Sequence, residues 1–156
     1  MKAVVVYDSY FGNTKTVAEE IGKAIGEDVM VYSVKEFDFD ELDNIDLLIV
    51  GSPTRAFRPT KLITYLIKVV SKSNNLQSVA CFDTRMHITD KEPWVLRKLE
   101  KRFGYATDTM VKILSKNKNI KVLDPNWFYV GEAEGPLLDD EIQKAIEWTN
   151  GIVNNV

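Results

Sequence analysis

Short apolar runs rich in β-branched residues recur along the chain and alternate with longer segments of helical periodicity. Continuous runs of this length predict β-strands. They lie at residues 4–7, 29–34, 46–51, 78–82, 120–123 and 127–130. The run at 46–51 is almost wholly apolar, which is typical of a strand buried on both faces of a parallel sheet. The last two runs flank Asp124-Pro125-Asn126 and form either one interrupted fifth strand or a strand plus a short edge piece.

Segments with apolar residues three and four positions apart predict the helices between these strands. The first helix follows residue 16 and has apolar residues at positions 17, 18, 21, 24 and 25. Further helical segments end at Val70, span 93–119 with a break at Gly104-Tyr105, and span 137–153. We expect Asn13 or Thr14 to cap the first helix and Thr60 to cap the second.

Strands and helices that alternate with short connections predict βαβ units, right-handed crossovers and a sheet covered by helices on both faces. The expected fold class is α/β, a doubly wound five-stranded parallel sheet with strand order 2-1-3-4-5. No repeat, low-complexity tract or linker divides the chain. We therefore expect residues 1–156 to form a single domain.

Three polar loops follow the first, third and fourth predicted strands. They comprise residues 9–14, 52–60 and 83–90. In open parallel sheets, ligands bind outside the carboxyl ends of the strands, where the strand order reverses. The predicted order brings all three loops to that edge, so the sequence predicts a ligand site there.

The first loop, Ser9-Tyr10-Phe11-Gly12-Asn13-Thr14, suits a phosphate group. Its hydroxyls, its glycine and the free amides of the following helix offer donors to an anion without a bound metal. An ordinary βα turn with a good N-cap would have the same composition, and that interpretation stays open. The chain contains neither G-x-x-x-x-G-K-[ST] nor G-x-G-x-x-G, which favours a mononucleotide over a dinucleotide or triphosphate.

Composition narrows the classes of function. The chain is 45% hydrophobic and 28% charged, with a net charge of −3 and no basic run, which argues against nucleic acid as the main partner. Cys81 is the only cysteine, so an internal disulfide and a thiolate metal site are excluded. The opening apolar run is too short for a signal sequence or a membrane span, and we expect a cytoplasmic protein without membrane insertion. No catalytic triad, acid–base pair or metal-ligand set is evident.

Two segments of the chain resemble motifs of the flavodoxin family. The first loop is similar to the family's [ST]-x-T-G-N-T phosphate loop, and Gly51-Ser52-Pro53-Thr54 is similar to its G-[ST]-P-T loop. Each follows an apolar strand, and the resemblance covers the whole chain. It implies a three-layer flavodoxin-like sandwich of the short-chain type, FMN as the cofactor and redox partner proteins, with the chain a monomer or a weak dimer.

The resemblance also implies which residues would contact the flavin. The phosphate would be held by residues 9–14, that is Ser9, Tyr10, Phe11, Gly12, Asn13 and Thr14. The isoalloxazine ring would be flanked by Pro53, Thr54, Arg55, Ala56 and Phe57 from the second loop and by Thr84, Arg85, Met86 and His87 from the third.

The chain departs from the family pattern at several of these positions. Phe11 replaces the usual threonine, and no pair of aromatic residues is evident on either side of the ring. Arg55, Arg58 and Arg85 occupy loops that are acidic in many relatives, so we expect a less reducing hydroquinone. Each arginine could instead be a solvated loop residue, a partner for a neighbouring aspartate, or a contact for an anionic substrate or redox partner.

The first functional hypothesis is an FMN-binding electron-transfer protein, in which the cofactor supplies the chemistry. The second is a flavin-dependent oxidoreductase that acts on a quinone, a porphyrinogen or NAD(P)H. The third is a flavin-free binding or regulatory module on the same fold. A redox carrier is favoured over a stand-alone enzyme because the chain shows no acid–base machinery.

Overall fold

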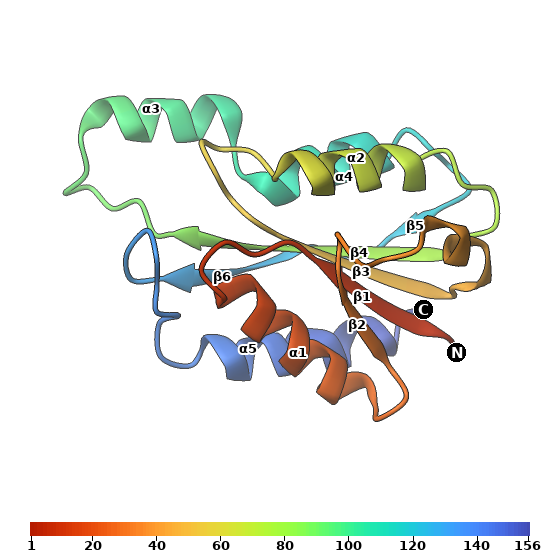
Figure 1. Cartoon of the computed structure of the whole chain (residues 1–156). Coiled ribbons are helices and arrows are strands. Elements are labelled where there is room, and N and C mark those ends of the chain that lie inside the picture. The colour runs from red at the N-terminus through yellow and green to blue at the C-terminus, as the bar shows by residue number, and fades with distance from the viewer.

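The computed structural model describes residues 1–156, which form one parallel sheet with helices on both of its faces (Figure 1). The strands are β1 (Ala3–Tyr7), β2 (Met30–Ser33), β3 (Leu47–Pro53), β4 (Ser78–Met86), β5 (Lys121–Val122) and β6 (Asn126–Val130). The helices are α1 (Asn13–Ile25), the short 3-10 helix η1 (Phe39–Asn44), α2 (Lys61–Val70), α3 (Trp94–Phe103), α4 (Ala106–Leu114) and α5 (Glu141–Val153). The order β2-β1-β3-β4-β5 confirms the predicted topology and the α/β class.

The two faces of the sheet carry separate apolar cores. Helices α1 and α5 cover one face, and α2 and α4 cover the other (Figure 1). Successive residues of β1 alternate between them, because side chains point to opposite faces along a strand. Val4 and Val6 belong to the same apolar core as Ile63 of α2, whereas Val5 belongs to the same core as Ile21 of α1. Burial on both faces explains why the strand sequences are nearly continuous apolar runs.

The fifth position of the sheet is an interrupted strand, as the sequence allowed. β5 pairs with the start of β4, and β6 pairs with the end of β4, both in parallel register. The second pairing runs from Phe82 opposite Asn126 to Met86 opposite Val130. Both β5 and β6 therefore pair with β4, and the carboxyl end of β6 lies at the edge of the sheet where the polar loops converge.

Strand β4 is longer than its apolar run indicated. The expected strand ends at Phe82, but β4 continues to Met86, so the prediction that residues 83–86 belong to a loop is wrong. Asp83 and Arg85 are two positions apart and project to the same side, where they pair with each other. Polar residues remain in the strand because their charges are satisfied there.

Two predicted helix starts are corrected. Gly12, in the left-handed conformation at φ 95°, precedes α1 without any side-chain cap, so neither Asn13 nor Thr14 caps it. Helix α5 begins at Glu141 rather than at Leu137, because Leu137 forms a bridge with Val130. The predicted cap at Thr60 is confirmed, since its Oγ1 accepts from the backbone N–H of Ile63 at 3.3 Å.

The predicted break between α3 and α4 is also confirmed. Helix α3 ends at Phe103, and the backbone N–H of Tyr105 donates to Asp108 Oδ2 at 2.7 Å at the start of α4. None of the residues of α3 is buried, and Figure 1 shows this helix projecting beyond α2 and α4. No helix of the protein has the length and apolar character needed to span a lipid bilayer.

Candidate functional site

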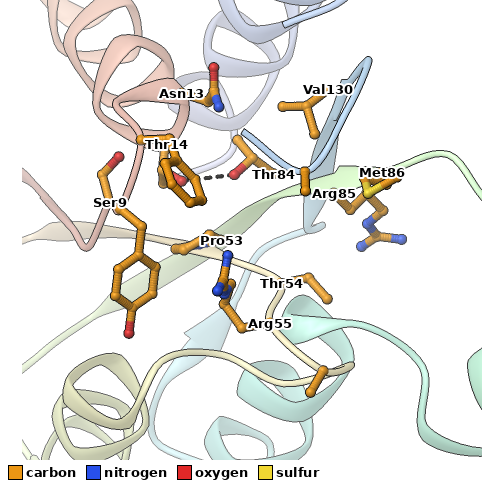
Figure 2. A pocket seen from close by; sticks show the side chains of 14 residues that line it. Ser9, Asn13, Thr14, Pro53, Thr54, Arg55, Thr84, Arg85, Met86 and Val130 are labelled. Atoms are coloured by element: carbon orange, nitrogen blue, oxygen red, sulfur yellow. Dashed lines mark hydrogen bonds between the residues drawn. The ribbon is translucent and has the colours of Figure 1, made fainter. Parts of the chain in front are cut away.

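A pocket of about 310 Å³ lies at the carboxyl ends of β1, β3 and β4, where the polar loops converge (Figure 2). Its walls come from the β1–α1 loop, the loop after β3, the end of β4 and the segment that follows β6. The lining residues are Ser9, Tyr10, Phe11, Asn13, Thr14, Pro53, Thr54, Arg55, Ala56, Thr84, Arg85, Met86, Val130 and Ala133.

The pocket brings together all the residues predicted for the site except Gly12, Phe57 and His87. Gly12 directly precedes α1, and Phe57 occupies the turn between Arg55 and Arg58. The exposed His87 ring packs edge-on against Tyr129, with 4.8 Å between ring centroids.

Sequence reasoning missed Val130 and Ala133. Val130 ends β6 and Ala133 follows it, so the rule that located the other loops also applies here. The signal was the carboxyl end of the interrupted fifth strand. It was overlooked because the residues after it are acidic and small rather than rich in hydroxyls.

The β1–α1 loop presents unpaired backbone donors. Ser9 Oγ accepts from the N–H of Gly12 at 3.0 Å, and Asp8 Oδ1 accepts from the N–H of Ser9 at 2.9 Å. The N–H groups that find no acceptor in the protein are those of Tyr10, Phe11, Asn13, Thr14 and Lys15. They cluster at the positive end of the α1 dipole, which is the arrangement that binds an anion.

A buried hydrogen bond joins this loop to the end of β4. Thr14 Oγ1 and Thr84 Oγ1 lie 2.8 Å apart, drawn as the dashed line in Figure 2. Only 1% of Thr14 is exposed. The hydroxyl of Thr14 therefore holds two walls of the pocket together, while the backbone amides of the same loop remain free.

The segment after β6 closes over the start of α1. Asn13 Nδ2 donates to the carbonyl oxygen of Glu134 at 3.0 Å. A Cβ on Gly135, whose φ is 106°, would lie 2.5 Å from Asn13 Oδ1, so only glycine permits this approach. Ala133 is thereby placed in the wall of the pocket.

The loop after β3 is a tight turn whose stem is anchored to the body of the protein. Thr54 Oγ1 accepts from the N–H of Ala106 at 3.0 Å, at the start of α4. Arg55 and Arg58 exchange two backbone hydrogen bonds of 2.8 and 3.0 Å. Between them, Ala56 and Phe57 adopt φ values of 46° and 63°, which is a strained conformation for residues with a Cβ.

Arg55 supplies a positive charge at the pocket. Its guanidinium carbon lies 5.0 Å from the ring centroid of Tyr10 and 5.6 Å from that of Phe11. Figure 2 shows the Arg55 side chain directed toward Pro53 in the lining of the pocket. The aromatic groups of the site therefore come from the β1–α1 loop. No carboxylate lines the pocket, although the buried Asp8 lies behind this loop.

Arg85 is not a free loop cation. Its guanidinium makes two hydrogen bonds to the carboxylate of Asp83, at 2.7 and 2.6 Å, and only 7% of the residue is exposed. It stacks on Tyr105 at 3.6 Å and on Trp127 at 4.7 Å. The alternative that an arginine pairs with a neighbouring aspartate is confirmed for Arg85, whose charge is therefore neutralised locally.

Asp83 is satisfied from a second direction as well. Its Oδ2 accepts from the N–H of Thr107 at 3.0 Å and from the hydroxyl of Thr107 at 2.9 Å. The hydroxyl of Tyr105 donates to Glu100. Burial, and then this hydrogen bond, raise the pKa of Tyr105 above that of a free tyrosine. We refer to Asp83, Arg85, Tyr105, Thr107 and Trp127 as the β4 cluster.

A family model described as the flavodoxin domain matches residues 4–93, more than half of the chain. The matched segment includes the β1–α1 loop, the loop after β3 and all of β4. This chain belongs to the flavodoxin family. No curated protein sequence matches it.

Solved flavodoxin structures share the fold across the full length of this flavodoxin-family chain. A flavodoxin from the domain Archaea is 24% identical, with a TM-score of 0.67 over 99% of this chain and 98% of that one. Oxidised flavodoxin 1 from Bacillus cereus is 18% identical, with a TM-score of 0.74 over 100% and 99%. A short-chain flavodoxin associated with a bacterial microcompartment is 14% identical, with a TM-score of 0.74 over 99% of both chains.

Proposed function

We propose that this flavodoxin-family chain binds FMN and acts as a single-domain electron carrier for redox partner proteins. The observation that carries the proposal is the set of free backbone N–H groups at the start of α1. A phosphate dianion there would gain charge-assisted hydrogen bonds and the favourable end of the helix dipole. The absence of a carboxylate from the lining removes the repulsion that a dianion would otherwise meet.

The residues of the pocket fit the rest of the mononucleotide. A volume of about 310 Å³ lies at the lower end of the range for small-molecule sites. The free amides of residues 10, 11 and 13–15 would hold the phosphate, and the ring would lie among residues 53–56, 84–86, Val130 and Ala133. When bound, the flavin supplies one- and two-electron redox chemistry, while the protein binds, orients and shields it from water.

A carrier fits the lining better than an enzyme with its own acid–base chemistry. The lining contains no histidine, cysteine or carboxylate, and its buried arginine is already paired with Asp83. His87, the one histidine of the chain, lies outside the pocket against Tyr129. The pocket therefore offers binding groups and one exposed cation, Arg55, without a histidine, a cysteine or a carboxylate for proton transfer.

The test is to compare the affinities of the purified protein for FMN and for riboflavin, which lacks the phosphate. We expect FMN to bind at least about 100-fold more tightly, equivalent to about 2.7 kcal/mol, because only FMN can use the free amides. Equal affinities would contradict phosphate capture, and failure of both ligands would favour a flavin-free module. Turnover of NAD(P)H or a quinone by the isolated holoprotein would favour the enzyme over the carrier.

A further inference from the structure

A second, larger hollow of about 620 Å³ adjoins the pocket and runs between the loop after β3 and helices α2 and α4. Its cations are Arg55, Arg58, Lys61 and Lys68, which we call the basic groove. Lys61 and Lys68 are two turns of α2 apart, so they lie about 10 Å from each other along one side of the helix. Arg58 and Arg55 continue the row toward the pocket.

The four charges of the basic groove are unpaired. Their side chains belong to none of the salt bridges of the protein, which involve other lysines and arginines. No acidic residue lines the groove. Without these four positive charges, the rest of the chain would carry a net charge of −7 in place of the total of −3. The groove is therefore a local concentration of positive charge on an otherwise acidic protein.

Acidic residues lie only beyond the edge of this groove. The Tyr65 ring packs edge-on against Phe39 of η1, with 5.7 Å between centroids. The segment around η1 carries Asp38, Asp40, Glu41 and Asp43, none of which forms a salt bridge with the groove. Tyr65 therefore separates the two signs of charge on this face of the molecule.

The basic groove and the pocket share a wall. Tyr10 and Arg55 line both, and Tyr10 lies under the Arg55 guanidinium. A macromolecule seated on the groove would therefore touch residues that also enclose the proposed flavin. For a carrier, this proximity is what a docking surface requires.

The arrangement fits an acidic protein surface better than a small anion or a nucleic acid. The lysines and arginines of the groove are exposed and spread along a row, whereas a small anion site needs donors that converge on one point. Tyr10 and Tyr65 are 60% and 61% exposed, and tyrosine is enriched in protein interfaces. A long polyanion would extend beyond four cations onto the acidic remainder of the surface and be repelled.

We propose that the basic groove is the docking surface for an acidic redox protein, which it brings to the mouth of the flavin pocket. That the partner is a redox protein rests on the proposed function, whereas its acidic character rests on the charges of the groove alone. Attraction between opposite charges across such an interface accelerates and orients association, and this attraction weakens as the salt concentration increases.

The experiment uses the flavin-free full chain and fluorescein-labelled poly-L-glutamate as the acidic probe, with binding followed by fluorescence anisotropy. The test variant is R58Q/K61Q/K68Q, which leaves Arg55 and every other pocket residue in place. The control is K23Q/K35Q/K118Q, which removes the same charge from exposed lysines outside the groove. We expect at least about tenfold weaker binding for the test variant at low salt and less than twofold for the control.

Equal losses in the two variants, or binding that does not weaken with salt, would overturn the proposal. An oligonucleotide of matched charge that binds the groove tenfold more tightly than poly-L-glutamate would also overturn it. FMN titration separates this result from the proposed function, because Arg58, Lys61 and Lys68 do not line the pocket. Weaker probe binding by the test variant with unchanged FMN affinity would support the docking surface. If the wild-type chain bound the probe but not FMN, the groove would still be a docking surface for an acidic protein, and only the proposal that this protein is a redox partner would fail.

Discussion

The β1–α1 loop and the end of β4 contain similar polar residues but use them in opposite ways. In the loop, most side-chain groups bond locally or across to Thr84, and a cluster of backbone N–H groups has no partner. At the end of β4, Asp83 receives bonds from Arg85 and Thr107, and aromatic rings cover the guanidinium. The first region is left open to a ligand, and the second is closed on itself.

This difference shows that a polar sequence after a strand does not by itself indicate a binding site. What matters is whether the hydrogen-bonding capacity of the segment is satisfied within the protein, since buried polar groups require partners. The difference also changes the electrostatics expected of the pocket. Of the arginines considered from the sequence, Arg85 is neutralised, Arg58 lies outside the pocket, and Arg55 alone presents an unpaired charge to it.

The largest effect is expected from opening the β4 cluster. Asp83→Asn removes the charge that compensates the buried Arg85, and we expect a loss of about 3–5 kcal/mol in the free energy of unfolding. Urea denaturation measures this loss. Asp90→Asn is the control, because Asp90 is fully exposed beside Arg97 and its substitution should leave the free energy of unfolding almost unchanged. If both variants lost the same unfolding free energy, the buried Asp83–Arg85 pair would contribute no more to stability than the exposed Asp90–Arg97 pair.

The bond between the two regions should matter less. Thr14→Val leaves the buried hydroxyl of Thr84 without its partner, and we expect a loss of about 1–3 kcal/mol in unfolding free energy. The double variant with Thr84→Val should recover part of this loss, since neither hydroxyl is then orphaned. Thr16→Val, at an exposed position, is the control. Additive losses in the double variant would show that the two hydroxyls act independently.

A smaller effect is expected from the cation of the open region, and it depends on FMN binding. At an effective dielectric constant of 20, one charge about 6 Å from the reduced ring is worth at most about 3 kcal/mol before solvent screening. Because Arg55 is exposed, we expect Arg55→Gln to lower the second-electron potential by only on the order of 50 mV, near the value for 1.4 kcal/mol and one electron. Spectroelectrochemical titration measures it. Arg58→Gln should shift the potential less, and an equal shift would contradict the special placement of Arg55.

The smallest effect concerns the pH dependence of the closed region. Burial, and then the bond to Glu100, raise the pKa of Tyr105, so the folded protein keeps this proton where the unfolded chain loses it, above about pH 10. The contribution of Tyr105 to stability is therefore complete below that pH and is lost as the pH rises further. Unfolding experiments between neutral and alkaline pH should show a shallower decline for Tyr105→Phe than for the wild type. An identical decline would mean that Tyr105 ionises freely in the folded state.

Much of the fold followed from local pattern. The apolar runs identified β1 to β4, and the interruption at Asp124-Pro125-Asn126 separates β5 from β6 in the structure. The predicted boundaries were wrong where a residue pairs with a distant segment of the chain. Strand β4 extends beyond its apolar run because Asp83 accepts a hydrogen bond from Thr107, 24 positions later in the sequence. Helix α5 begins after the predicted residue because Leu137 pairs with Val130.

The candidate site shows the same division. The convergence of the loops and most of the lining could be predicted, because parallel strands deliver their carboxyl ends to one edge. The sequence could not predict that Arg55 remains unpaired while Arg85 is paired with Asp83, although both arginines were expected in polar loops after strands. Stacking on Tyr105 and Trp127 requires the α3–α4 junction and β6 to meet β4, and no sequence spacing encodes that meeting.

The sequence by itself determined the doubly wound parallel sheet and the edge at which a ligand would bind, because these follow from hydrophobic periodicity and the handedness of βαβ connections. Only the tertiary structure decided which polar groups remain free. It left the amides before α1 and the cations of the basic groove without partners, and it closed the β4 cluster. The physical reason is that a hydrogen bond or a charge is satisfied by whatever lies next to it in space, and such neighbours are set by packing between distant segments.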